Sequence, residues 1–182
     1  MPTTPNAVQL NSDDFERIQL IGKGAFGEVW KGRNKKTGDI IAIKVINLDE
    51  SEDEIEDIQQ ETHVMIQCNS PFIVRVYGSF MSGVELWIIM EYVGGGSVFQ
   101  AMKAIRYFDA NSNGIPENLA AVILRELLRG LEYLHGEGKL HRDIKCANIL
   151  LTDSGDVKIA DFGVAGQLSD KIGKKHTFVG TP

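Results

Sequence analysis

Two short motifs near the end of the chain decide the fold: "HRDIKCAN", residues 141–148, and "DFG", residues 161–163. Together they carry Asp143, Asn148 and Asp161, three polar residues with side-chain oxygens. Either motif alone could arise by chance. The weight that they carry therefore depends on what precedes them in the chain.

Immediately upstream, the sequence predicts two helices behind a flexible linker. "VGGGS", residues 93–97, is the most flexible stretch and predicts a boundary between two lobes. "SVFQAMKAIRYF" predicts one helix, and a second runs from near Pro116 to His135 with Gly136 as its C-cap. The second helix is apolar around more than one face, which predicts neighbours on several sides. Its apolar residues are Leu119, Val122, Ile123, Leu124, Leu127, Leu128, Leu131 and Leu134.

The N-terminal half predicts strands and one helix. "FERIQLIG", "GEVWKGR" and "DIIAIKVI" predict a meander, "FIVRVYGSF" and "LWIIMEY" predict two more strands, and "VKIAD" predicts a short late strand. Residues 48–68 place apolar side chains at helical spacing among many acids, which favours an amphipathic helix. Residues 1–14 are polar, contain two prolines and are expected to form a loose tail.

The glycines of "GKGAFGEV" follow the pattern G-x-G-x-x-G at Gly22, Gly24 and Gly27. Glycines let backbone amides approach a phosphate closely. A dinucleotide-binding turn needs a helix next, whereas residues 28–33 are strand-like, and no Gly-Lys-Ser/Thr follows for a Walker loop. We therefore expect the glycines to lie in a hairpin over a ligand, with a turn that holds no ligand as the alternative.

Lys44 on a predicted strand and Glu61 on the predicted helix complete an ordered set with the two opening motifs. This set resembles the eukaryotic protein kinase family over roughly residues 15–182. The resemblance implies an α+β, two-lobed fold. The N-lobe, residues 15–93, would contain a five-stranded antiparallel sheet and one helix. The C-lobe, residues 94–182, would be mainly helical, incomplete, and end in the activation loop.

The resemblance implies ATP and Mg²⁺ as cofactors and assigns roles to the polar residues. Gly22, Gly24 and Gly27 would hold the phosphates, Lys44 would contact the α- and β-phosphates, and Glu61 would pair with Lys44. Asp143 would orient the substrate hydroxyl and accept its proton, while Lys145 would neutralise charge on the transferred group. Asn148 and Asp161 would bind magnesium. A lysine at the position of Lys145 is typical of serine/threonine kinases.

The same resemblance implies an adenine site formed by apolar residues and one backbone segment. Glu91–Val93 would bond the adenine edge, and Met90 would guard a back pocket. Plain core packing is the alternative for the apolar positions. The remaining residues expected to contact the nucleotide are Ile21, Val29, Ala42 and Leu150.

"LWIIMEYVGGGS" and "HTFVGTP" are similar to the germinal-centre branch of the sterile-20-like kinases. In that branch the threonine corresponding to Thr177 is the regulatory phosphosite, and Arg142 is expected to pair with its phosphate. Thr181 is expected near Asp143. Because further kinase helices are expected after Pro182, the chain is expected to be poorly stable and weakly active. A nucleotide-binding or scaffolding fragment with little catalysis is the alternative function.

Composition sets the remaining expectations. The 182 residues carry a net charge of −6 and two cysteines, which argues against nucleic-acid or anionic-membrane binding, a disulfide framework and a zinc site. No secretory signal is visible, so a cytoplasmic protein is expected. The resemblance implies protein substrates and a scaffold adaptor as partner. "YFDANSNGIP", residues 107–116, begins like a calcium loop but lacks its final glutamate, so a polar turn is expected. Cys146 is expected to be a small buried residue.

Overall fold

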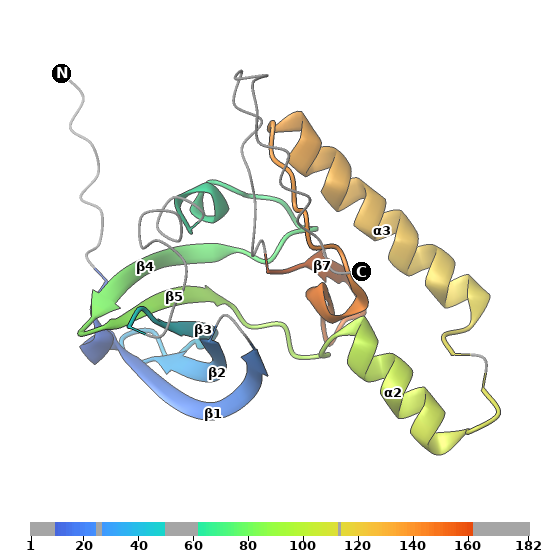
Figure 1. Cartoon of the computed structure of the whole chain (residues 1–182), viewed down its shortest axis with the longest axis horizontal. Coiled ribbons are helices and arrows are strands. Elements are labelled where there is room, and N and C mark those ends of the chain that lie inside the picture. The colour runs from blue at the N-terminus through green and yellow to red at the C-terminus, as the bar shows by residue number, and fades with distance from the viewer. Residues whose placement is uncertain (1–9, 25–26, 50–61, 113, 162–182) are drawn as a thin grey trace. The chain divides into compact units, whose positions relative to one another are not determined.

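The computed structural model describes residues 10–24, 27–49, 62–112 and 114–161. Within these, the chain forms two compact units, one drawn from residues 1–53 and 77–92 and the other from residues 54–76 and 93–182. Figure 1 labels the main elements. They are η1 (Ser12–Asp14), β1 (Phe15–Gly24), β2 (Gly27–Asn34), β3 (Ile40–Asn47), β4 (Val76–Ser82), β5 (Glu85–Glu91), α2 (Val98–Phe108), α3 (Glu117–Gly136), η2 (Cys146–Asn148), β6 (Ile149–Leu151) and β7 (Val157–Ile159).

The first unit is built on a five-stranded sheet in the order β1-β2-β3-β5-β4 (Figure 1). β1, β2 and β3 form an antiparallel meander, and β5 pairs antiparallel with β3. The predicted five-stranded sheet is therefore confirmed. β-branched residues dominate β3, with four isoleucines and one valine among its eight residues. "NKKTGD" supplies the turn between β2 and β3, where Gly38 takes a positive φ of 81°.

The two faces of this sheet have different character, because successive side chains of a strand point to opposite faces. One face carries a hydrophobic core to which Trp30 and Phe80 add partly buried rings. Trp30 lies opposite Ile43, so both side chains belong to that face, whereas Val29 lies opposite Lys44 on the other. The core residues are Phe15, Ile41, Ile43, Val45, Trp87 and Ile89.

The polar segment before β1 is not wholly irregular. Ser12–Asp14 form a 3-10 helix, with the side chain of Asn11 accepting a hydrogen bond from the backbone N–H of Asp13. Leu10 packs against the sheet core. Residues 62–66 are helical, as predicted, while residues 50–61 of the predicted helix lie outside the described residues. The lobe boundaries given above remain predictions.

The second unit contains both predicted helices (Figure 1). α2 begins with a capping box, in which Gln100 N–H donates to the Ser97 hydroxyl and Ser97 N–H donates to the Gln100 side chain. The predicted cap at Gly136 is wrong, because that residue is still helical. Glu137 is the C-cap, and Gly138 takes the left-handed conformation after it, with φ 68°.

Only one face of α3 is covered. Leu127, Gly130 and Leu134 are buried, and Gly130 allows the helix to approach the side chain of Ile159 on β7. Leu124 and Leu128 remain 56% and 63% exposed. The neighbours expected on several sides of this helix are thus not found within the described residues. No helix in the described part of the chain is long and apolar enough to span a membrane.

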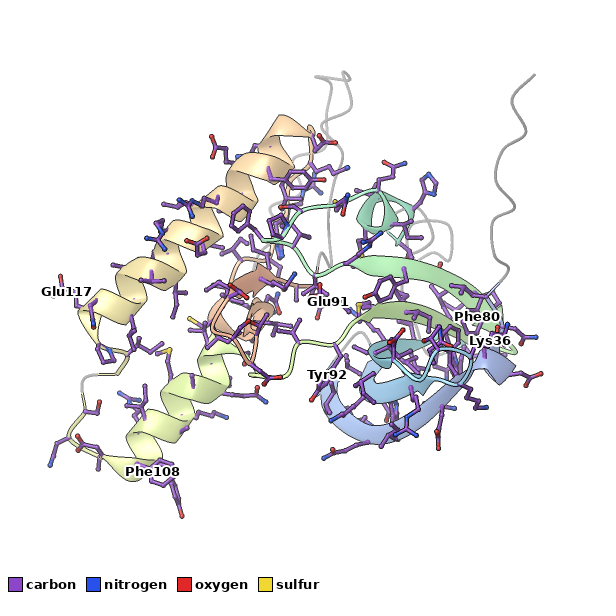
Figure 2. All side chains as sticks on the ribbon, turned by 180° about the vertical axis from the view of Figure 1, so that it is seen from behind. Lys36, Phe80, Glu91, Tyr92, Phe108 and Glu117 are labelled. Carbon is purple, nitrogen blue, oxygen red and sulfur yellow. The ribbon has the colours of Figure 1, made fainter. Side chains whose placement is uncertain are left out.

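The segment after α3 contains a small two-stranded sheet. β6 pairs antiparallel with β7, and Ile73 forms a parallel bridge with Ile159. The connection between α2 and α3 is a polar turn, in which Asn111 N–H donates to the Asp109 carboxylate. Phe108 projects from the end of α2 and is 85% exposed (Figure 2).

Candidate active site

The "HRDIKCAN" motif folds into a hydrogen-bonded cluster in the second unit. Lys145 Nζ lies 2.7 Å from Asp143 Oδ2. Asn148 Nδ2 donates to the backbone oxygen of Asp143 at 2.9 Å and to its Oδ2 at 3.0 Å. These contacts fix the Asp143 carboxylate from two sides, and its side chain is only 15% exposed. The arrangement can hold a carboxylate and an ammonium group beside a reacting hydroxyl.

His141 supports the Asp143 backbone from within the core. It is 2% exposed. The N–H of Asp143 donates to His141 Nδ1 at 3.2 Å, and Nε2 lies 2.9 Å from the oxygen of Ala160. Nδ1 must therefore accept and Nε2 must donate, which defines one neutral tautomer. Burial lowers the pKa of His141, which also favours the neutral ring. His141 is therefore a packed residue that holds the backbone of this motif.

Asn148 and Asp161 are the residues expected to bind magnesium. Because both Asn148 Nδ2 contacts go to Asp143, the amide presents Oδ1 as its remaining acceptor. Asp161 directly follows Ala160 and takes a left-handed backbone, with φ 58°. Such a conformation in a residue other than glycine is strained and frequently marks functional sites. An amide oxygen and a carboxylate fit a hard cation. The described residues hold no group of three or more His, Cys, Asp or Glu for a metal.

The segment after the first unit is tied to β6. Gly95 N–H donates to the Leu151 oxygen, and Leu151 N–H donates to the Gly96 oxygen. Ser97 forms an isolated antiparallel β-bridge with Leu150. A Cβ at residue 95 would lie 2.6 Å from the Leu151 oxygen, which explains this glycine of "VGGGS". The stretch predicted as a flexible linker is therefore ordered by backbone bonds at its end. Leu150, an expected adenine contact, is half-buried.

The glycine motif lies in a hairpin, as expected. Gly22 pairs with Val29, and Gly24 pairs with Gly27 across the turn. Gly27 has φ 105°, and a Cβ there would clash with the backbone oxygen of Val45. A Cβ at Gly24 would meet nothing within 4 Å. Packing among the described residues thus explains Gly27 but not Gly24, whose expected contact with a phosphate stays a prediction.

The sheet register brings four of the expected nucleotide contacts to one face: Val29, Ala42, Lys44 and Met90. Val29 lies opposite Lys44, and Ala42 lies opposite Met90. Lys44 is 7% exposed despite its charge. Glu91 ends β5 and lies opposite Ile41, so its side chain points to the opposite face of the sheet. Ile21 is 40% exposed near the end of β1, and Val93 opens the second unit half-buried.

Sequence reasoning missed one pair on this face. Lys31 lies opposite Ala42, and its Nζ lies 4.8 Å from the centroid of the Tyr92 ring. This cation–π contact fixes a positive charge beside the expected adenine contacts. The alternation of side chains along β2 could have predicted that Lys31 shares a face with Val29. Only the structure shows that Lys31 contacts the Tyr92 ring.

Several expected residues are not part of the described structure. Glu61, Thr177, Thr181 and the last two residues of "DFG" lie outside the described residues, so their roles stay predictions. Arg142 is described, exposed, and left-handed with φ 66°. The expectation for Cys146 is wrong, because this cysteine is exposed, whereas Cys68 is the buried one.

Comparison with known proteins gives consistent matches. Residues 15–182 match the protein kinase domain family. The chain is 49% identical over 174 residues to serine/threonine-protein kinase sid1 of Schizosaccharomyces pombe, which covers 95% of the chain and 35% of that protein. Identity is 48% to serine/threonine-protein kinase dst1 of Dictyostelium discoideum, covering 96% of the chain and 23% of that kinase. It is also 48% to human mitogen-activated protein kinase kinase kinase kinase 3, covering 93% and 18%. The chain therefore spans well under half of these relatives.

Proposed function

The chain belongs to the protein kinase family, and from this premise we propose that it transfers the γ-phosphoryl group of Mg-ATP to serine and threonine hydroxyls of proteins. Its relatives are serine/threonine kinases of the sterile-20-like, germinal-centre type, which agrees with the branch predicted from the sequence. The observation that carries the proposal is the bonded cluster of Asp143, Lys145 and Asn148.

Asp143 acts on the substrate hydroxyl. Its carboxylate is oriented by Lys145 and Asn148, so it can accept the hydroxyl proton as the oxygen attacks phosphorus. Lys145 neutralises charge that develops on the transferred group. His141 is already committed through both ring nitrogens, so its role is to position Asp143 rather than to move a proton.

Asn148 and Asp161 are the proposed magnesium ligands. These two residues would hold the magnesium, which would supply positive charge to neutralise the phosphates. Asn148 offers Oδ1 because its Nδ2 is held by Asp143, so the residue that orients the base also orients a metal ligand. A change at Asn148 is therefore expected to disturb both functions.

The nucleotide-binding residues of this proposal are those assigned from the sequence. Gly22, Gly24 and Gly27 present backbone amides to the phosphates, and Lys44 contacts the α- and β-phosphates. Glu61 pairs with Lys44. The adenine contacts are those named from the sequence: Ile21, Val29, Ala42, Met90, Glu91, Val93 and Leu150.

Regulation, partners and location extend the proposal. Phosphorylation of Thr177 would raise activity by pairing with Arg142. The substrates are proteins of a signalling cascade, a scaffold adaptor is a partner, and the chain acts in the cytoplasm. The signalling cascade is supported by the relative named mitogen-activated protein kinase kinase kinase kinase 3. The phosphosite, the adaptor and the location rest on the sequence-based expectations above.

The test is phosphate transfer from radiolabelled ATP to a generic protein substrate, made with the chain and with the longest transcript product that contains it. We expect transfer to serine and threonine, and an Asp143→Asn variant should be slower by about 100-fold or more. Equal rates in the variant and the parent would overturn the proposal. Mg-ATP binding without any transfer in either form would favour the alternative, a nucleotide-binding scaffold.

A further inference from the structure

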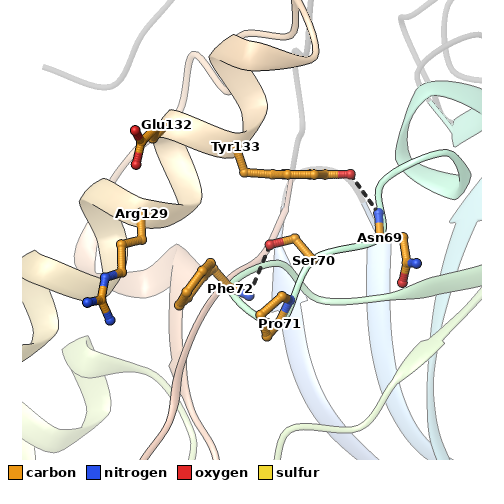
Figure 3. A pocket seen from close by; sticks show the side chains of 7 residues that line it. All are labelled: Asn69, Ser70, Pro71, Phe72, Arg129, Glu132 and Tyr133. Atoms are coloured by element: carbon orange, nitrogen blue, oxygen red, sulfur yellow. Dashed lines mark hydrogen bonds between the residues drawn. The ribbon is translucent and has the colours of Figure 1, made fainter.

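A pocket of about 490 Å³ opens on the second unit, between α3 and the loop that leads to β4 (Figure 3). It shares no residue with the proposed catalytic cluster. Its volume is within the range of ligand-binding pockets. The residues that line it are Asn69, Ser70, Pro71, Phe72, Arg129, Glu132 and Tyr133.

The loop side of this pocket is held in place by hydrogen bonds. Asn69 N–H donates to the Tyr133 hydroxyl at 2.8 Å, and Phe72 N–H donates to the Ser70 hydroxyl at 3.3 Å (Figure 3). The backbone oxygen of Phe72 accepts from Ile159 N–H of β7 at 2.8 Å. The loop is thus tied to α3 and to the small sheet, so the pocket is formed before any ligand arrives.

The helix side carries two charges of unequal availability. Arg129, Glu132 and Tyr133 share one face of α3, since they are three and four residues apart. Arg129 is already engaged, with NH1 3.0 and 3.2 Å from the two carboxylate oxygens of Glu126. Glu132 is exposed and has no hydrogen-bond or ion-pair partner among the described residues. The charge that the pocket offers is therefore negative.

The apolar surface comes from aromatic rings. Phe72 and Tyr133 are both half-buried and contribute rings from opposite sides of the pocket. Pro71, Arg129 and Glu132 at the rim are exposed. Pockets for small metabolites enclose most of the ligand surface. This open rim suits instead a side chain presented by a larger molecule.

We propose that this pocket binds a peptide segment of a partner protein in which an apolar side chain adjoins a lysine or arginine. The apolar side chain packs against Phe72 and Tyr133, and the cation pairs with the Glu132 carboxylate. The Tyr133 hydroxyl already accepts from Asn69, so its hydrogen can donate to a carbonyl of the peptide. This inference does not depend on kinase activity.

The test is an NMR titration of the ¹⁵N-labelled chain with the dipeptide acetyl-Phe-Arg-amide. We expect saturable shifts of the Asn69 and Phe72 amides, because both bond to groups of the pocket. Acetyl-Phe-Glu-amide, of equal apolar content, should bind more weakly. Glu132→Gln should weaken the arginine peptide by about two- to fivefold, the range of one exposed ion pair.

A matched variant addresses the opposite charge. Glu126→Gln removes the carboxylate that pairs with Arg129, so the guanidinium becomes available to the glutamate peptide. The ratio of the affinities for the arginine and glutamate peptides should therefore be smaller in this variant than in the parent. Glu132 is exposed, whereas the Glu126 side chain is only 14% exposed and lies four and eight residues from the buried Gly130 and Leu134. A circular dichroism spectrum that matches the parent is therefore required of each variant before its affinities are compared. Equal affinity for the two peptides, unchanged affinity in Glu132→Gln, or no shift at Asn69 and Phe72 would each overturn the proposal.

Discussion

Gly24 and Gly27 face each other across the β1–β2 hairpin but differ in what surrounds them. A Cβ at Gly27 would clash with the Val45 oxygen in a left-handed backbone, so Gly27→Ala should destabilise the chain by about 1–3 kcal/mol. Gly24→Ala should leave the free energy of unfolding within about 0.5 kcal/mol of the parent. Urea unfolding followed by circular dichroism compares the two variants.

The substitutions at Gly24 and Gly27 can also distinguish an effect on folding from an effect on ligand binding. If Gly24 is needed only for nucleotide binding, Gly24→Ala should weaken Mg-ATP binding although the variant folds normally. Strong destabilisation by Gly24→Ala would mean that packing, rather than a ligand, requires this glycine.

His141 makes stability depend on pH in a defined direction. Burial holds the pKa of His141 below its unfolded value, so the unfolded chain takes up the proton more readily. The contribution of the neutral ring is therefore complete above the unfolded pKa of about 6.5 and is lost as the pH falls through the lower folded pKa. We expect the urea midpoint of the parent to fall between about pH 7.5 and 5.5, and to fall less in His141→Gln.

His135 provides the control for this measurement. It is exposed at the end of α3, so His135→Gln should keep the parental fall of the midpoint with pH. A parental pH dependence in His141→Gln would contradict the assignment, because another group would then be responsible.

At the residue scale, the sequence was sufficient for the motif residues because their chemistry depends on residue type and spacing. Asp143, Lys145 and Asn148 do meet in the structure. The sequence was insufficient where the exposure of a side chain, or its contact partner, depends on long-range packing. Cys146 was expected to be buried and is exposed, and the contact between Lys31 and Tyr92 joins residues far apart in the chain.

α3 shows how one helix can be both core and surface. Leu134 is fully buried, whereas Leu128 is 63% exposed. Leu134→Ala should cost about 2–5 kcal/mol of unfolding free energy, because it removes buried methyl groups and leaves a cavity. Leu128→Ala should change it by less than about 0.5 kcal/mol. Urea denaturation measures both, and comparable losses would mean that Leu128 is covered by a partner element.

At the element scale, long periodic segments were predictable, whereas of the two three-residue strands β7 was predicted from "VKIAD" and β6 was not. The strands β1, β2, β3 and β5 and both helices carry enough residues for their pattern to be recognised. β6 contains three residues and exists through its pairing with β7, so local pattern did not reveal it. The end of α3 was misplaced because the glycines at 136 and 138 both suit a helix terminus, and only the backbone φ identifies Gly138.

The whole molecule consists of two compact units, and the proposed function assigns nucleotide-binding residues to both. A ligand that binds only the folded state stabilises every part whose opening destroys its site. Mg²⁺ with a non-hydrolysable ATP analogue should therefore slow hydrogen exchange in β3, which carries Lys44, and also in β6, which follows Asn148.

At a ligand concentration of 100 times Kd, amides that exchange through such opening should slow by about 100-fold in both units. Asp161→Asn, which lacks the carboxylate proposed to bind magnesium, should lose most of this protection at the same concentrations. Protection confined to β3 would mean that the nucleotide engages the first unit alone. Because Asp143 and Asn148 are in the second unit, that result would separate nucleotide binding from the proposed catalytic cluster and favour the scaffolding alternative.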